Sequence, residues 1–203
     1  MEIYKKDHQK EIATMSKGTL FILSGPSGVG KTTISDELCK IENIFVSISD
    51  TTREKRENEV DGIDYNFITD KEFSKKVDED GYLEWANVHG NHYGTPAKEI
   101  LNRIHSGLNA LLVIDVQGAK QIRDKIQSSV LIFLLPPTIN ELRNRLNGRS
   151  TDEESVIERR IEKATDEINS SLIYDYSVVN HNIARATSDV VRIINNCKSR
   201  RIS

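Results

Sequence analysis

The sequence predicts an α/β fold in which helices cover both faces of a mainly parallel sheet. Short apolar runs rich in β-branched residues alternate with helical patterns along the chain. Most of these runs are continuously apolar rather than alternating, which is typical of strands that are buried on both faces. Start and stop signals of helices lie between the runs. These observations together favour three layers of secondary structure around one sheet.

Six runs are candidate strands, and each helical pattern between them has recognisable ends. The strands are predicted at residues 19–24, 44–49, 65–68, 110–115, 130–135 and 176–180. Capping-box spacing occurs at Thr69 with Glu72, Thr138 with Glu141 and Thr151 with Glu154.

Two helices carry further sequence signals. Thr95 precedes a proline at the predicted first position of one helix, and Gly107 ends that helix. In the long helix after Thr151, a single apolar stripe is predicted from Ile157, Ile161, Ala164, Ile168 and Leu172.

Composition indicates one ordinary globular domain. The 203 residues are 37% hydrophobic and 29% charged, which excludes the disordered and membrane classes. No apolar run approaches the roughly 18 residues of a membrane span, and a net charge of −3 gives no basic field for nucleic acid. Cys39 and Cys197 match no metal-binding spacing, so we expect a reducing cytoplasm.

Three segments depart from the regular alternation. Residues 1–16 are polar and aperiodic, and we expect a poorly ordered extension there. Residues 49–95 contain several glycines and many charges, which predicts a lobe inserted into the core. A polar stretch at about 146–160 predicts a small lid. The core then comprises residues 17–48, 96–145 and 161–203.

A phosphate-binding loop follows the first predicted strand. Residues 25–32 match the pattern G-x-x-x-x-G-K-[ST] between a strand and a helix. Glycines let the backbone N–H groups surround a phosphate, and the following helix adds the positive end of its dipole. In such loops the lysine reaches the β- and γ-phosphates and the hydroxyl binds Mg²⁺. The loop therefore predicts a P-loop NTPase-type core whose ATP site comprises Gly25, Pro26, Ser27, Gly28, Val29, Gly30, Lys31, Thr32 and Thr33.

Asp115 ends another predicted strand and has two interpretations. An acid at that end of a strand beside a P-loop is placed to hold Mg²⁺ through water, together with Thr32. It could equally be the N-cap of the helix that follows. Its position alone leaves both roles open.

Further motifs narrow the reaction class. The segment SISDTTREKR at 47–56 is followed by DYNF at 64–67, EW at 84–85, GNHYGT at 90–95 and IDVQG at 114–118. In this order they closely resemble the guanylate kinases, from about residue 17 to the C-terminal helix. The resemblance implies transfer of phosphate from ATP to GMP or dGMP, with Mg²⁺, in purine nucleotide metabolism.

The resemblance implies that the inserted lobe binds GMP. The family pattern places the acceptor site at Ser49, Arg53, Arg56, Tyr65, Glu84, Tyr93, Thr95 and Asp115. Guanine presents two adjacent N–H donors that one carboxylate can accept, which suits Glu84. The two arginines offer fork-shaped donors for a phosphate. Taken singly, Glu84 could instead be a surface acid, the tyrosines core aromatics and the arginines part of a solvated face.

The resemblance also implies catalytic arginines in the lid. Arg145, Arg149 and Arg160 match them and would neutralise charge beside Lys31 during transfer. Asn180 matches an asparagine near the adenine of ATP. The chain departs from the family at Val113, where many members have an acid. If that acid binds the acceptor or the metal, Asp115 and Glu84 must take over its share.

Two other functions compete with this one. Another small-molecule P-loop kinase would have no use for Glu84 in reading a base. A binding module that resembles the family but has lost catalysis would not need the intact Gly25, Gly30, Lys31 and Thr32. We therefore expect a cytoplasmic kinase, monomeric or homodimeric, whose partners are ATP and GMP, with no nucleic acid or membrane.

Overall fold

The computed structural model describes residues 18–41, 44–88, 90–148, 154–169 and 171–199, so the extension predicted at 1–16 lies outside the described residues. The strands are β1 (Leu20–Ser24), β2 (Phe45–Val46), β3 (Asp50–Thr51), β4 (Asn66–Phe67), β5 (Tyr82–Val88), β6 (Asn91–Pro96), β7 (Ala110–Val113), β8 (Val130–Leu135) and β9 (Tyr176–Val179). The helices are α2 (Lys31–Cys39), α3 (Asp70–Asp78), α4 (Ala97–His105), α5 (Val116–Lys125), α6 (Ile139–Asn147), α7 (Glu154–Asn169), α8 (Ile183–Ser199) and the 3₁₀ helix η1 (Ser171–Ile173).

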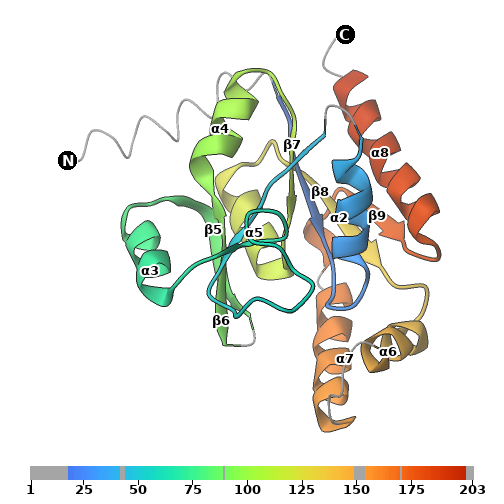
Figure 1. The fold of residues 1–203 in the computed structure, drawn as a ribbon. Coiled ribbons are helices and arrows are strands. Elements are labelled where there is room, and N and C mark those ends of the chain that lie inside the picture. The colour runs from blue at the N-terminus through green and yellow to red at the C-terminus, as the bar shows by residue number, and fades with distance from the viewer. Residues whose placement is uncertain (1–17, 42–43, 89, 149–153, 170, 200–203) are drawn as a thin grey trace.

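A parallel sheet in the order β2-β7-β1-β8-β9 forms the centre of the molecule. Side chains of β1 alternate between its faces, with Leu20 and Ile22 packed against α4 and α5. Phe21 and Leu23 pack against α2 and α8 on the other face. Figure 1 shows these two helix pairs on opposite sides of the sheet. The predicted three-layer α/β fold is confirmed.

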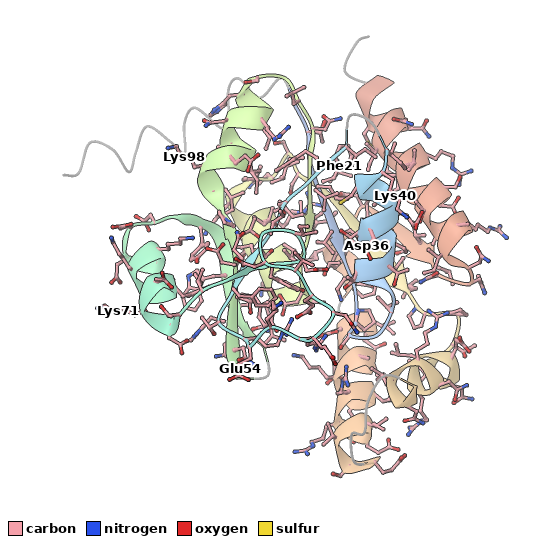
Figure 2. All side chains as sticks on the ribbon, viewed as in Figure 1. Phe21, Asp36, Lys40, Glu54, Lys71 and Lys98 are labelled. Atoms are coloured by element: carbon pink, nitrogen blue, oxygen red, sulfur yellow. The ribbon has the colours of Figure 1, made fainter. Side chains whose placement is uncertain are left out.

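The central strands are the hydrophobic core of the protein. Phe21 is 1% exposed and lies in the interior, whereas Lys71 and Lys98 lie on helices at the periphery (Figure 2). Fully burying one large apolar side chain stabilises a fold by about 1.5–3 kcal/mol. The continuously apolar runs at β1, β7 and β8 are explained by this burial on both faces.

A second sheet, in the order β4-β3-β6-β5, is formed between residues 50 and 96. Its strands β5 and β6 are antiparallel, and α3 packs beside them (Figure 1). The predicted capping box begins α3: Thr69 accepts from the backbone N–H of Glu72, and Glu72 accepts in return from the backbone N–H of Thr69. In the view of Figure 1 this small sheet lies to the left of the central sheet, and α6 and α7 lie at the lower right, below the central sheet.

Two further predicted helix ends are confirmed, and a third lies outside the described residues. Thr138 accepts from the backbone N–H of Glu141 and begins α6 as expected. Gly107, with φ of +82°, follows the end of α4, also as expected. The capping box at Thr151 lies outside the described residues. None of the helices in the described part of the chain combines the length and apolarity that a membrane span requires.

Two helix predictions are wrong. Thr95 is not a cap, because it belongs to β6 and pairs with Glu84 of β5, while α4 begins after Pro96. Leu172 does not extend the apolar stripe of α7, because that helix ends at Asn169 and Leu172, in η1, is 95% exposed. Ile157, Ile161 and Ala164 are buried as predicted.

The strand predictions also need correction in places. The run at 44–49 is a strand only at Phe45–Val46, and the run at 65–68 only at Asn66–Phe67. Strands β5 and β6 were not predicted as such. Both carry polar side chains such as Glu84 and Thr95 on buried positions, so they lack the apolar signal of the central strands.

Candidate active site

The P-loop lies between the end of β1 and the first turn of α2. Gly25, Gly28 and Gly30 all have positive φ, a conformation that other residues rarely adopt. A Cβ at Gly25 would lie 2.4 Å from the carbonyl oxygen of Leu134 on the neighbouring strand. The backbone therefore needs glycine here for both conformation and space, and it leads directly into the positive end of α2.

Lys31, the first residue of α2, directs its ammonium into this loop. Its Nζ donates to the carbonyl of Gly25 at 2.5 Å and to that of Pro26 at 3.1 Å. Burial lowers the pKa of Lys31 to about 8, although the charges of Glu167 and Asp115 act in the opposite direction. The ammonium is thus held inside the loop by its backbone carbonyls.

Two predicted site residues donate hydrogen bonds to the backbone of the P-loop. Asn180, which is 1% exposed, donates from Nδ2 to the carbonyl of Val29 at 2.8 Å. Arg145 donates to the same carbonyl at 3.4 Å and to the carbonyl of Asn180 at 3.0 Å. Both side chains contact the P-loop backbone and neither lines the cavity described next.

A cavity of about 260 Å³ lies between the P-loop, the second sheet and α7. It brings together predicted residues from distant parts of the chain, namely Gly25, Ser27, Lys31, Ser49, Arg56, Tyr65, Glu84, Tyr93, Asp115 and Arg160. The other described residues of the predicted sites do not line it, namely Pro26, Gly28, Val29, Gly30, Thr32, Thr33, Arg53, Thr95, Arg145 and Asn180. Arg149 lies outside the described residues.

Glu84 is the buried acid of this cavity. It lies on β5, is 4% exposed, and accepts a 2.5 Å hydrogen bond from the hydroxyl of Thr95 on β6. Burial raises the pKa of Glu84 to about 7, with a smaller contribution from the charge of Asp115, while the hydrogen bond from Thr95 acts in the opposite direction. The alternative that Glu84 is a surface acid is therefore wrong.

The two arginines of the inserted segment have different surroundings. The guanidinium of Arg53 donates two hydrogen bonds to Glu59, at 2.8 and 3.0 Å, and one to the hydroxyl of Tyr93 at 3.2 Å. Arg56 faces the cavity, and its side chain is 74% exposed. An anion in the cavity would therefore meet Arg56, whereas Arg53 would act through Tyr93.

Asp115 begins a helix and also lies beside the P-loop, as its two interpretations from the sequence require. Its Oδ1 accepts from the backbone N–H of Gly118 at 2.9 Å, so it is the N-cap of α5. It also lines the cavity, close enough to Lys31 to affect the pKa of that lysine. The helix cap is thus established, and it places a carboxylate beside the P-loop.

The donor atoms at this end of the cavity are compatible with Mg²⁺. The described residues contain no cluster of three His, Cys, Asp or Glu side chains that could hold a metal alone. Mg²⁺ in kinases is usually held by one or two carboxylates, waters and substrate phosphates, all through oxygen. The carboxylate of Asp115, which lines the cavity, is one such oxygen donor, and the hydroxyl of Thr32, next to Lys31 in the first turn of α2 but outside the cavity lining, is another.

Sequence reasoning missed several residues that line the cavity. Lys163 and Glu167 lie one and two turns after Arg160 on α7, with a Nζ–Oε1 distance of 3.9 Å between them. Ala86 and Val88 follow Glu84 at the two-residue spacing of a strand. Helical and strand periodicity counted from Arg160 and Glu84 would have indicated all four.

Comparison with known proteins agrees with this geometry. The family model described as guanylate kinase matches residues 17–197. The chain is 45% identical to a guanylate kinase of Neisseria meningitidis, over 91% of each sequence. It is 43% identical to one of Clostridium acetobutylicum, over 88% of this chain and 85% of that one.

A solved structure gives the same result. The guanylate kinase of Anaplasma phagocytophilum superposes with a TM-score of 0.77 at 33% identity, over 91% of this chain and 88% of that one. The resemblance inferred from the motifs is thereby confirmed. This chain belongs to the guanylate kinase family.

Proposed function

We propose that this protein transfers the γ-phosphoryl group of ATP to GMP, producing ADP and GDP. One observation carries the proposal: a buried carboxylate, Glu84, shares a cavity with the P-loop lysine, Lys31. The carboxylate accepts from the two adjacent N–H donors of guanine, a pair that adenine lacks. The same cavity therefore holds a guanine reader and a phosphate binder.

The acceptor phosphate is held by other residues of the same cavity than the base. Arg56, Tyr65 and Tyr93 line the cavity, and their guanidinium and hydroxyl groups are donors suited to a phosphate. Ser49 and Thr95 complete base recognition, Thr95 by orienting Glu84. These contacts go to base and phosphate, so dGMP is a second acceptor.

Transfer needs positioning and charge neutralisation more than proton removal. A phosphate monoester has a second pKa near 6, so the GMP phosphate is largely dianionic at pH 7 and attacks without a strong general base. Lys31 and Arg160 neutralise the charge that spreads over the transferred group. Thr32 and, through water, Asp115 would hold Mg²⁺, which would supply further neutralisation of the charge on the ATP phosphates.

The division of the chain into parts is also proposed. Residues 49–95 form the GMP-binding lobe, 146–160 the lid, and the remainder of 17–203 the core. The guanidinium of Arg160, at the lid end of α7, donates to the hydroxyl of Ser27 at 2.9 Å, which supports contact between lid and P-loop. Arg149 falls in the same lid. Both described cysteines are free thiols, which supports the reducing cytoplasm as the compartment.

A coupled assay of ADP release tests the function directly. ATP and Mg²⁺ are supplied with GMP, AMP, CMP or UMP in separate reactions. We expect turnover with GMP alone among the four. Faster turnover with another monophosphate would identify a different small-molecule kinase, and binding of GMP without ADP release would identify a binding module.

A further inference from the structure

Helix α5 packs on strand β5 at the position of Glu84. Positions 118, 121 and 125 have the i, i+3, i+7 spacing of one helix face. They contact three consecutive strand residues, 84, 85 and 83 respectively. One face of α5 therefore contacts Glu84, the residue that we propose reads the base, and both of its neighbours on the strand.

Gly118 is the closest of these contacts. A Cβ built on Gly118 would lie 2.3 Å from Oε2 of Glu84 and 2.9 Å from its Cδ, distances that real side chains do not reach. Gly118 lies within α5 and does not have the positive φ that would require glycine. Glycine is less favourable than alanine inside a helix, so the backbone does not explain this residue, whereas the space needed by the carboxylate does.

Gln121 holds the strand residue next to Glu84 by both of its backbone groups. Its Nε2 donates to the carbonyl of Trp85 at 2.7 Å, and its Oε1 accepts from the backbone N–H of Trp85 at 3.3 Å. The amide of Gln121 thus makes the same two hydrogen bonds to the backbone N–H and C=O of Trp85 that a residue on a neighbouring strand would make. The backbone on the C-terminal side of Glu84 is thereby fixed to α5.

Lys125 holds the residue on the other side. Its Nζ donates to the carbonyl of Leu83 at 2.7 Å. The pairing of β5 with β6 shifts register at this point, because Tyr82 is opposite Pro96 but Glu84 is opposite Thr95. Bulges of this kind change the direction of a side chain and occur beside active sites. Lys125 therefore contacts the backbone where the strand turns Glu84 toward the cavity.

We propose that Gly118, Gln121 and Lys125 are positioning residues that set the guanine preference of the enzyme by holding the carboxylate of Glu84 in place. One carboxylate oxygen is oriented by Thr95, and the other lies against Gly118. The inference rests on the proposed role of Glu84 as the guanine reader. It adds that α5, which begins at Asp115 beside the P-loop, determines where that reader lies.

The first test is Gly118→Ala, assayed with GMP and with inosine 5′-monophosphate, which lacks the exocyclic amine. The added methyl group displaces the carboxylate. We expect KM for GMP to rise by about tenfold or more, and the preference for GMP over the inosine nucleotide to fall by a similar factor. KM for ATP should stay within about twofold.

A double-mutant cycle separates positioning from general damage. In a Glu84→Ala background the methyl group at position 118 no longer meets the carboxylate. There, Gly118→Ala should lower kcat/KM for GMP by less than about twofold. An equal loss in both backgrounds, or an unchanged preference in the single variant, would overturn the proposal.

Gln121→Ala is the second test, because it removes the amide without adding bulk. Trp85 is the only tryptophan of the chain, so its fluorescence reports on this strand. We expect a shifted Trp85 emission and a higher KM for GMP. Lys120→Ala, on the exposed side of the same helix, is the matched control and should change neither. If Gly118→Ala does not fold, the comparison of Gln121→Ala with Lys120→Ala tests the inference instead. Equal Trp85 emission and equal KM for GMP in these two variants would contradict it.

The role of Glu84 as base reader and the positioning role of α5 can be tested separately. If Glu84→Ala keeps the preference for GMP over the inosine nucleotide, the proposed base reader is wrong and the inference falls with it. If Glu84→Ala loses the preference while Gly118→Ala and Gln121→Ala keep it, only the positioning role of α5 is wrong.

Discussion

The hydroxyl of Thr95 donates a 2.5 Å hydrogen bond to Oε1 of Glu84 across the antiparallel strands β5 and β6. This bond favours the ionised carboxylate, yet burial outweighs it and raises the pKa of Glu84 to about 7. The residue that we propose as the guanine reader is thus about half protonated at neutral pH in the absence of nucleotide. Only the ionised form accepts from both guanine donors.

Binding of GMP should therefore weaken in mild acid. With a pKa of about 7, the ionised fraction of Glu84 falls about fivefold between pH 7 and pH 6, and KM for GMP should rise by a similar factor. The folded state binds more protons than the unfolded state between the usual pKa of 4.5 and about 7, so the contribution of Glu84 to stability falls as pH rises through this window.

Steady-state kinetics from pH 5.5 to about 8.5 check this expectation. The GMP phosphate also titrates, near pH 6. Glu84→Gln serves as the control, because any pH dependence that remains in it belongs to groups other than Glu84, such as the phosphate or Lys31, whose pKa is about 8. A KM for GMP that is equally pH-dependent in both proteins would show that Glu84 does not titrate in this range.

Replacing Glu84 by Gln should remove base selection. The variant keeps the size of the side chain but turns an amide donor toward a guanine donor. We expect kcat/KM for GMP to fall by at least about 10²-fold, or roughly 2.7 kcal/mol. KM for ATP should change little. The comparison variant is Arg56→Ala, which should weaken every monophosphate alike because a phosphate contact carries no information about the base.

Lys31→Ala should abolish phosphoryl transfer and leave the fold intact. The ammonium is hydrogen-bonded to two P-loop carbonyls, in the loop that we propose binds the ATP phosphates. Its lowered pKa, about 8, means that the folded protein binds fewer protons than the unfolded chain between about 8 and 10.5, so stability should rise with pH there. The variant should lack this rise in thermal melts. Turnover close to that of the parent would show that Lys31 is not part of the donor site.

The parts of the fold that the sequence predicted well are those set by local patterns. Apolar runs predicted β1, β7 and β8 because both faces of the central sheet are covered. The P-loop was predicted from its motif between a strand and a helix, since the conformation of such a loop depends on its own glycines and on the first turn of α2. Thr69 with Glu72 was predicted because a capping box involves only four consecutive residues.

Tertiary contacts account for what could not be predicted. Thr95 has the sequence signature of a helix cap, but pairing with β5 places its hydroxyl on Glu84 instead. Arg53 and Arg56 look equivalent in sequence, yet Glu59 holds only Arg53 in a two-point ion pair. The contact of Gly118 with Glu84 joins residues 34 positions apart, and no local rule indicates it.

Asp50 is a buried acid in the inserted segment. Asp50 is 0% exposed and accepts from Nδ2 of Asn66 at 2.8 Å, Nζ of Lys76 at 2.6 Å and Oη of Tyr82 at 2.7 Å. Burial raises the pKa of Tyr82, and the hydrogen bond to Asp50 raises it further, so this phenol remains a donor at all ordinary pH values. The carboxylate joins β3, α3 and β5 through these partners.

Asp50→Ala should destabilise the protein by about 3 kcal/mol, because it leaves a buried hydroxyl and an ammonium without their acceptor. Urea unfolding followed by the fluorescence of Trp85, which lies on β5, measures the change. Tyr82→Phe is the matched control: it removes one donor while Asp50 keeps Lys76 and Asn66, so the loss should be only about 1 kcal/mol. If both variants unfold at the same urea concentration, the ion pair with Lys76 contributes nothing, since the two differ mainly in whether that cation keeps its partner. A loss that appears only for Asp50→Ala would instead place the stabilising interaction in the carboxylate and its charge rather than in the phenol.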